Sequence, residues 1–117
     1  QIKRIKKILM KKRKLFLFFK KIFANNRFFK LINEPKKSKS NFWLQTILID
    51  KKHLNLKEKI IKDLAKKKIY VRPSWELMTN LCYFKGCPKM DISISEKVCK
   101  RIINIPSSSF LIERLKN

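Results

Sequence analysis

The chain has 117 residues, of which 44% are hydrophobic, so it is long enough for one domain with a core, and disorder throughout is excluded. Its single glycine, Gly86, excludes the phosphate-binding loops of Rossmann and P-loop proteins, which need several glycines. The formal net charge of +23 predicts attraction to polyanions, and the longest apolar run, residues 15–19, is too short to span a membrane.

The first 23 residues predict a long amphipathic helix, which ends at the Asn25-Asn26 pair. Apolar residues recur there at helical spacing with lysines between them, so we expect one stripe to face the core and the lysines to face solvent. A membrane-surface helix and a presequence-like segment are the alternative interpretations. The residues of the expected stripe are Ile2, Ile5, Leu9, Phe16, Phe19 and Phe23.

Two strands and a helix are predicted between residues 28 and 67. Residues 28–33 predict a short strand that ends before Pro35, and residues 42–49, which are β-branched and aromatic, predict a central strand. Asn55 is predicted to cap a helix that runs to about Lys67. The residues of this helix expected to face the core are Leu56, Ile60, Ile61 and Leu64.

The second half of the chain predicts one more strand, a long loop and a helix. Residues 69–71 predict a third strand that Arg72-Pro73 ends, and residues 72–90 predict an ordered loop with a short helix at about 75–80. Ser93 or Ser95 is predicted to cap a helix through Ile103, with Val98, Ile102 and Ile103 facing inward. An extended segment at 104–109 and a short turn at 110–115 complete the chain.

This order of elements predicts an α+β fold with a short, mostly antiparallel sheet that has helices on one face. We expect two parts in the chain: the long helix of residues 1–24 and a small α+β domain of residues 25–117. No internal repeat is visible.

No set of residues predicts catalysis or a metal site within the chain. Cys82, Cys87 and Cys99 lack a second CxxC pair, and the one histidine, His53, is distant in sequence, so we expect buried thiols rather than zinc ligands or a nucleophile. His53 itself is expected on a surface turn after Asp50. The acidic residues are scattered singly, and an odd number of cysteines predicts a reducing, cytoplasmic location.

A small basic protein that binds nucleic acid or another polyanion is the alternative function. Fifteen of the 31 Lys and Arg residues lie in the first 40 positions, where Glu34 is the one acidic residue, so binding would use residues 1–39. Only six of the 31 are Arg, the side chain that grips phosphate and reads base edges as a planar fork. The many Lys, Ile, Asn and Phe residues are also typical of a codon bias toward A and T. On this interpretation part of the positive charge reflects composition rather than a binding function.

Four segments stand out in this order: SNFWLQTILID (40–50), IYVRPSWELM (69–78), FKGCPKMD (84–91) and INIPSS (103–108). Together they resemble the C-terminal part of the DegT/StrS family of pyridoxal-phosphate-dependent sugar aminotransferases. The closest likeness is to the branch that acts on UDP-linked 4-keto amino sugars in bacillosamine and legionaminic-acid pathways. Residues 1–15 resemble the helix that leads out of the large domain in this family.

The resemblance implies that the chain is the small C-terminal domain of a fold-type I aminotransferase, with residues 1–24 as the helix that links it to a large domain. Pyridoxal 5'-phosphate and its Schiff-base lysine would belong to that large domain, whose segments are missing here. The chain opens with Gln1, so we expect a part of a longer protein that is inactive alone. Glutamate as amino donor and a homodimer are further implications.

Arg72, Pro73, Trp75, Leu77 and Met78 match the segment of the family that faces the substrate. An arginine suits the diphosphate of a nucleotide sugar, and a tryptophan suits an apolar ring face. Thr79-Asn80 stands where many relatives carry a histidine. The alternative interpretation is that Trp75 fills the core and Arg72 caps a carbonyl. The predicted substrate-binding residues are Arg72, Trp75, Met78 and Asn80.

Overall fold

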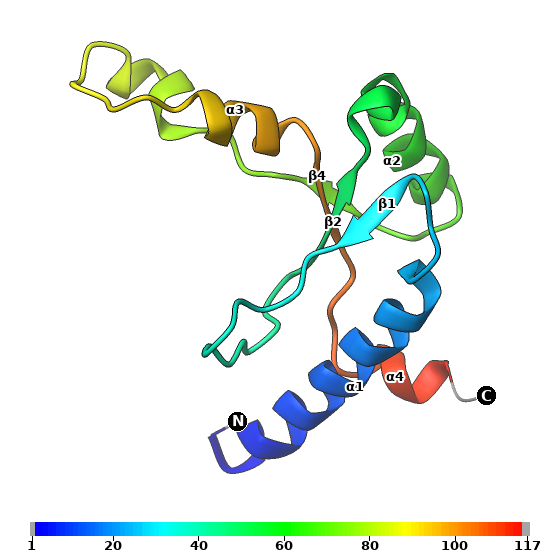
Figure 1. Ribbon diagram of the computed structural model, residues 1–117. Coiled ribbons are helices and arrows are strands. Elements are labelled where there is room, and N and C mark those ends of the chain that lie inside the picture. The colour runs from blue at the N-terminus through cyan, green and yellow to red at the C-terminus, as the bar shows by residue number, and fades with distance from the viewer. Residues whose placement is uncertain (1, 116–117) are drawn as a thin grey trace.

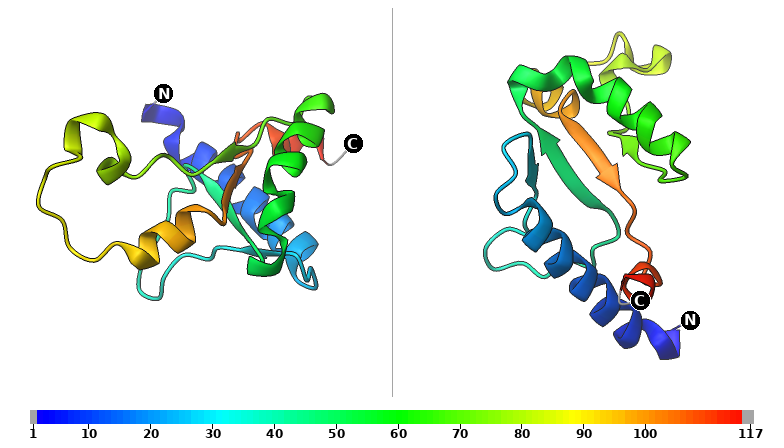
Figure 2. Two further views of the ribbon diagram at one scale, coloured as in Figure 1. Left: turned by 90° about the horizontal axis from the view of Figure 1, so that it is seen from above. Right: turned by 90° about the vertical axis from the view of Figure 1, so that its right-hand side faces the viewer.

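A computed structural model describes residues 2–115 as a four-stranded antiparallel sheet with two helices on one face (Figure 1). The strands are β1 (Phe29–Leu31), β2 (Gln45–Ile49), β3 (Arg72–Pro73) and β4 (Ile102–Ile105), in the order β1-β2-β4-β3. α1 (Ile5–Phe23) and α2 (Lys57–Lys66) cover the sheet, and α4 (Leu111–Arg114) packs against α1. α3 (Ser93–Cys99) and the residues before it project away from the sheet (Figure 2). We call residues 78–99 the arm. The predicted α+β fold is confirmed.

The core lies between the two helices and one face of β2 and β4. Burial alternates along both strands, and Ile47 of β2 lies opposite Ile103 of β4, with 5% and 1% of their surfaces exposed. Phe16 of α1 and Ile60 of α2 pack onto this face. Complete burial of one such side chain contributes about 1.5–3 kcal/mol, so this apolar face holds the sheet and helices together.

Only the second half of α1 packs as the apolar stripe predicts. Phe16 is 6% exposed and Phe19 and Phe23 pack against the core, whereas Ile2 and Ile5 are 87% and 51% exposed. The expectation was wrong for the first turns because this half of the helix extends beyond the edge of the sheet (Figure 1). Among residues 2–115, neither α1 nor any other helix is long and apolar enough to cross a membrane.

Polar contacts tie the long connection between β1 and β2 to α1. Lys12 Nζ donates to the carbonyls of Phe42 (3.1 Å) and Ser107 (2.9 Å), and burial lowers the pKa of this lysine. Arg13 donates to Glu34 Oε1 at 2.7 Å, and the other carboxylate oxygen of Glu34 accepts from the Ser40 amide at 2.7 Å. These bonds fix residues 34–43 although the connection contains no strand.

The fourth strand was predicted as helix, and that expectation was wrong. α3 ends at Cys99, so Ile102 and Ile103 belong to β4 rather than to a helix. Three of its four residues are isoleucines with alternating burial, and pairing with β2 outweighs a helical continuation. The serine caps expected for α3 were also wrong. Its N-cap is Ile92, whose side chain makes no capping hydrogen bond, and the Asp91 side chain one residue earlier accepts from the Ser93 amide at 2.9 Å.

The boundaries of α2 and of the third strand also differ from prediction. Asp50, not Asn55, begins the helical region by accepting from the Lys52 amide at 2.8 Å, and a 3-10 turn (Lys51–Leu56) precedes α2. Leu56 is therefore 37% exposed, whereas Ile60, Ile61 and Leu64 do pack against the core as expected. The third strand is residues 72–73 rather than 69–71, and its position at the sheet edge tolerates proline.

The predicted ordered loop contains two short 3-10 turns, Met78–Asn80 and Cys82–Phe84. Cys82 and Cys87 are exposed and Cys99 is half-buried, so the expectation of three buried thiols was wrong. The reason is that the arm carrying the first two cysteines stands away from the sheet (Figure 2) and that none of residues 78–99 is buried.

We expect Ile103→Ala to lower the free energy of unfolding by about 2–5 kcal/mol, because it leaves a cavity at the β2–β4 pairing. Urea denaturation followed by circular dichroism measures the change. Ile94→Ala is the matched control: its side chain is 74% exposed on α3, so the expected change is within about 0.5 kcal/mol. Equal effects of the two substitutions would contradict the assigned core.

The Glu34 network predicts an acid-sensitive contribution to stability. The hydrogen bonds from Arg13 and from the Ser40 amide lower the pKa of Glu34, so the folded state holds the carboxylate more favourably than the unfolded state. The ionised Glu34 therefore stabilises the folded state at pH values above the ordinary glutamate pKa of about 4.3. This stabilisation is lost as the pH falls through the lower pKa that Glu34 has in the folded state. Glu34→Gln should therefore flatten the acid limb of stability against pH, measured by urea midpoints between pH 7 and pH 3. Glu96→Gln, at an exposed site on α3, should leave that limb unchanged.

Candidate functional site

The segment that carries the predicted substrate residues is anchored to the sheet by Asn104. Its side-chain oxygen accepts from Thr46 Oγ1 at 2.8 Å, and its nitrogen donates to the carbonyl of Pro73 at 3.2 Å. Asn104 pairs with Thr46 on one side and with Arg72 on the other. Residues directly opposite each other share a face of a sheet, so these three form a polar row on the face away from α1 and α2.

The four predicted residues are exposed. Arg72 and Asn80 are exposed, and Trp75 and Met78 have 70% and 63% of their surfaces accessible. The alternative that Trp75 fills the core is therefore wrong. Within residues 2–115, the guanidinium of Arg72 takes part in no hydrogen bond or ion pair, so it does not cap a carbonyl and is available to an anion.

The four residues are not equally free. Asn80 donates through its side-chain amide to the carboxylate of Glu76, whereas Met78 begins the 3-10 turn with its side chain in solvent. Cys99 Sγ lies 3.5 Å from the carbonyl of Trp75 and joins the segment to the end of α3. Arg72 thus lies in β3 and Trp75 lies two residues beyond its end, whereas Met78 and Asn80 lie further along the chain in the first 3-10 turn.

Sequence reasoning did not single out Trp43 as a candidate site residue. The ring centroids of Trp43 and Trp75 are 5.7 Å apart with their planes inclined by 58°, and Trp43 is 62% exposed. Both residues lie in segments that carry the family resemblance, but their separation by 32 positions gave no sign of contact. Only the paired sheet shows that they are neighbours.

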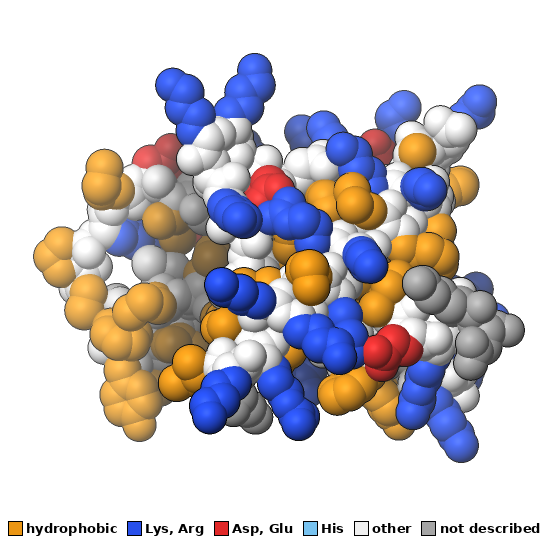
Figure 3. Space-filling view, turned by 90° about the horizontal axis from the view of Figure 1, so that it is seen from below, with side chains coloured by type: hydrophobic (Ala, Val, Ile, Leu, Met, Phe, Trp, Pro, Cys, Tyr) orange, Lys and Arg blue, Asp and Glu red, His pale blue; other side chains and the backbone are white. Residues whose placement is uncertain are grey.

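Several basic residues serve the fold itself. Lys11 pairs with Glu113 at 2.5 Å, Arg13 with Glu34, and Lys12 with backbone carbonyls. Lys57 donates to the carbonyl of Lys100 at 2.9 Å, and burial lowers its pKa. Figure 3 shows the remaining Lys and Arg side chains spread over the surface, while hydrophobic side chains gather towards the arm. The basic face is therefore not one continuous stripe in this view.

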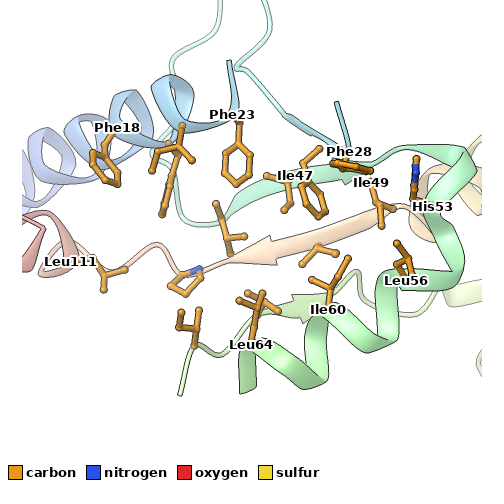
Figure 4. A pocket seen from close by; sticks show the side chains of 18 of the residues that line it. Phe18, Phe23, Phe28, Ile47, Ile49, His53, Leu56, Ile60, Leu64 and Leu111 are labelled. Atoms are coloured by element: carbon orange, nitrogen blue, oxygen red, sulfur yellow. The ribbon is translucent and has the colours of Figure 1, made fainter. Parts of the chain in front are cut away.

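An apolar groove of about 770 Å³ lies between α1 and α2 over the sheet (Figure 4). Phe18 and Phe23 line it from α1, and Leu64 lines it from α2. His53 stands at one end, half-buried, with its ring 4.8 Å from that of Phe28, so it is less exposed than the predicted surface turn implied. Side chains of this kind suit packing rather than recognition of a charged nucleotide. Within residues 2–115 there is no cluster of three potential metal ligands.

Comparisons with solved structures agree with this arrangement. The aminotransferase PseC of Helicobacter pylori, involved in the biosynthesis of pseudoaminic acid, superposes with a TM-score of 0.86 at 20% identity over 98% of this chain. The aminotransferase TlmJ of Streptoalloteichus hindustanus gives 0.83 at 10% identity over 97% of this chain. The sugar aminotransferase Spr1654 of Streptococcus pneumoniae, described as putative, gives 0.79 at 18% identity over 99% of this chain.

The chain spans about a third of the length of these proteins: 32% of PseC, 31% of TlmJ and 32% of Spr1654. At these identities the likeness establishes the fold. The sequence itself establishes the family, because residues 1–114 match it. The chain belongs to the DegT/DnrJ/EryC1/StrS aminotransferase family.

Proposed function

We propose that the chain is the C-terminal part of a pyridoxal-phosphate-dependent nucleotide-sugar aminotransferase. The reaction would transfer an amino group, with glutamate as donor, to a UDP-linked 4-keto-6-deoxy sugar of the bacillosamine or legionaminic-acid type. The observation that carries the proposal is the exposed segment 72–80, which the sheet holds in place through Asn104. This segment offers a cation and an aromatic ring on a fixed strand end.

Arg72 is the residue best suited to the diphosphate. Its guanidinium is planar, stays charged and can donate two parallel hydrogen bonds to phosphate oxygens. The hydrogen bonds that join Thr46, Asn104 and Pro73 hold the strand of Arg72 in place. Little conformational freedom of the backbone is therefore lost when the anion binds. Trp75, three residues further on, would contact a ring of the ligand, and Met78 and Asn80 would line the outer part of the site.

The cofactor does not fit the described residues of this chain. The two lysines whose pKa is lowered, Lys12 and Lys57, both donate to backbone carbonyls, so neither is available for a covalent bond to an aldehyde. The single glycine, Gly86, lies between the second 3-10 turn and α3, and one glycine cannot form a glycine-rich phosphate cradle. The solved PLP and PMP forms of Spr1654 support the use of this cofactor by relatives. We therefore place it in a large domain outside this chain.

The proposal also covers the domain arrangement, the location and the oligomeric state of the complete enzyme. Residues 1–24 would form the helix that connects the large domain to the small domain of residues 25–117, which fits the projecting first half of α1 (Figure 1). The complete enzyme would be a cytoplasmic homodimer that binds a nucleotide sugar and an amino donor. The chain alone would be inactive.

The first test compares this chain with a version extended upstream to the next start codon. After incubation with pyridoxal phosphate, we expect a visible, borohydride-sensitive aldimine band from the extended protein and none from the 117-residue chain. Absorbance spectroscopy measures it. A band from the short chain, or from neither protein, would contradict the proposed division of roles.

The second test addresses Arg72 in the extended enzyme. Arg72→Ala should raise the KM for the nucleotide sugar roughly 10- to 100-fold, because hydrogen bonds to a charged group are worth about 1.5–3 kcal/mol. Arg72→Lys should fall between the wild type and Arg72→Ala, since it keeps the charge and loses the fork. Arg27→Ala, an exposed arginine after α1, is the matched control and should leave KM unchanged. Equal KM values for all four proteins would remove Arg72 from the site.

A further inference from the structure

We propose that Trp43 is a second ligand-binding residue and that the indoles of Trp43 and Trp75 together bind the nucleobase of the nucleotide sugar. This inference rests on the proposed function and extends it to the base. The starting observation is that the two tryptophans of the chain touch each other, although 62% and 70% of their surfaces are accessible. Exposed aromatic side chains also occur elsewhere in this chain, but Trp43 and Trp75 contact each other and so offer a joint apolar surface to a ligand.

The backbone of Trp43 is held by three hydrogen bonds although its side chain is exposed. Its amide donates to Asn41 Oδ1 at 2.9 Å, and its carbonyl accepts from Ser107 Oγ at 2.5 Å and from Lys12 Nζ at 3.4 Å. These three bonds come from three different parts of the chain. The main chain that carries the indole is consequently fixed, which lowers the entropy cost of ordering this residue when a ligand contacts it.

The residue before Trp43 adopts a conformation that is unfavourable for a bulky side chain. Phe42 has φ of 50°, and its buried ring stacks on Phe16 at 4.6 Å. Left-handed backbone at a non-glycine residue costs on the order of 1–3 kcal/mol and gathers at functional sites. Here the unusual φ accompanies an inward Phe42 and an outward Trp43, which places the indole beside Trp75.

The geometry of the pair favours a flat aromatic ligand. Planes inclined by 58° form a corner, so one ligand ring stacks on one indole and meets the other with its edge. A nucleobase uses both contacts, because aromatic rings attract in offset-stacked and edge-to-face arrangements. A saturated sugar ring gains from the apolar contact alone.

A hollow and a polar group lie next to Trp43. Trp43 borders a hollow of about 430 Å³ that Asn41 and Lys12 also line, together with apolar residues of α1. Asn41 uses its side-chain oxygen for the Trp43 amide, which leaves its NH2 group to donate to a carbonyl of a pyrimidine base. The anchored Arg72 precedes Trp75 by three residues, so diphosphate and base would be bound by adjacent parts of one surface.

The test uses the extended enzyme and calorimetric dissociation constants for UDP, UDP-N-acetylglucosamine and free N-acetylglucosamine. Trp43→Ala and Trp75→Ala should each weaken both UDP and the UDP-sugar roughly 10-fold, the usual scale for loss of a base stack. Trp43→Phe should recover most of the affinity. The control Tyr70→Ala, at a side chain that is 71% exposed near the same segment, should change nothing.

Each other outcome overturns the proposal. Loss of affinity for the UDP-sugar with unchanged affinity for UDP would assign the pair to the sugar, and unchanged affinity for both would make Trp43 a packing residue. Thermal unfolding of each variant separates loss of binding from loss of folding. If the wild type aminates the nucleotide sugar and Arg72→Ala raises its KM while Trp43→Ala binds normally, only this inference fails and the proposed function stands.

Discussion

The pairing of β2 with β4 is the constraint on which the rest of the structure depends. Ile47 and Ile103 face each other across these strands, which are more than 50 positions apart in the sequence, on the apolar face that α1 and α2 cover. On the opposite face of the same strands, Thr46 and Asn104 hold β3 in place. One pairing therefore makes the core on one face and positions Arg72 on the other.

The apolar core and the proposed binding site lie on opposite faces of the sheet. The groove between α1 and α2 is lined by apolar side chains, whereas the segment 72–80 and Trp43 expose large side chains to solvent. Lys12 links the two, since its ammonium group bonds the carbonyls of Phe42, Trp43 and Ser107. Three backbone oxygens replace part of the water around this half-buried charge.

Local patterns predicted the helices, the central strand and the fold class, because these depend on nearby residues. The 102–105 strand was missed because Ile102 and Ile103 also continue a helical pattern from Val98, and only a partner strand distant in sequence decides between the two. The contact of Trp43 with Trp75 was missed for the same reason. Arg72 and Trp75 were proposed as site residues through the family resemblance, which carries long-range information that periodicity lacks.

We propose that the complete enzyme binds its nucleotide sugar at the exposed side chains of the segments 41–45 and 72–80. Hydrogen-exchange mass spectrometry of that enzyme, with and without UDP-N-acetylglucosamine, tests this proposal. We expect slower exchange in peptides that cover these two segments and no change in α2. Protection confined to other parts of the chain, or to the groove between α1 and α2, would contradict it.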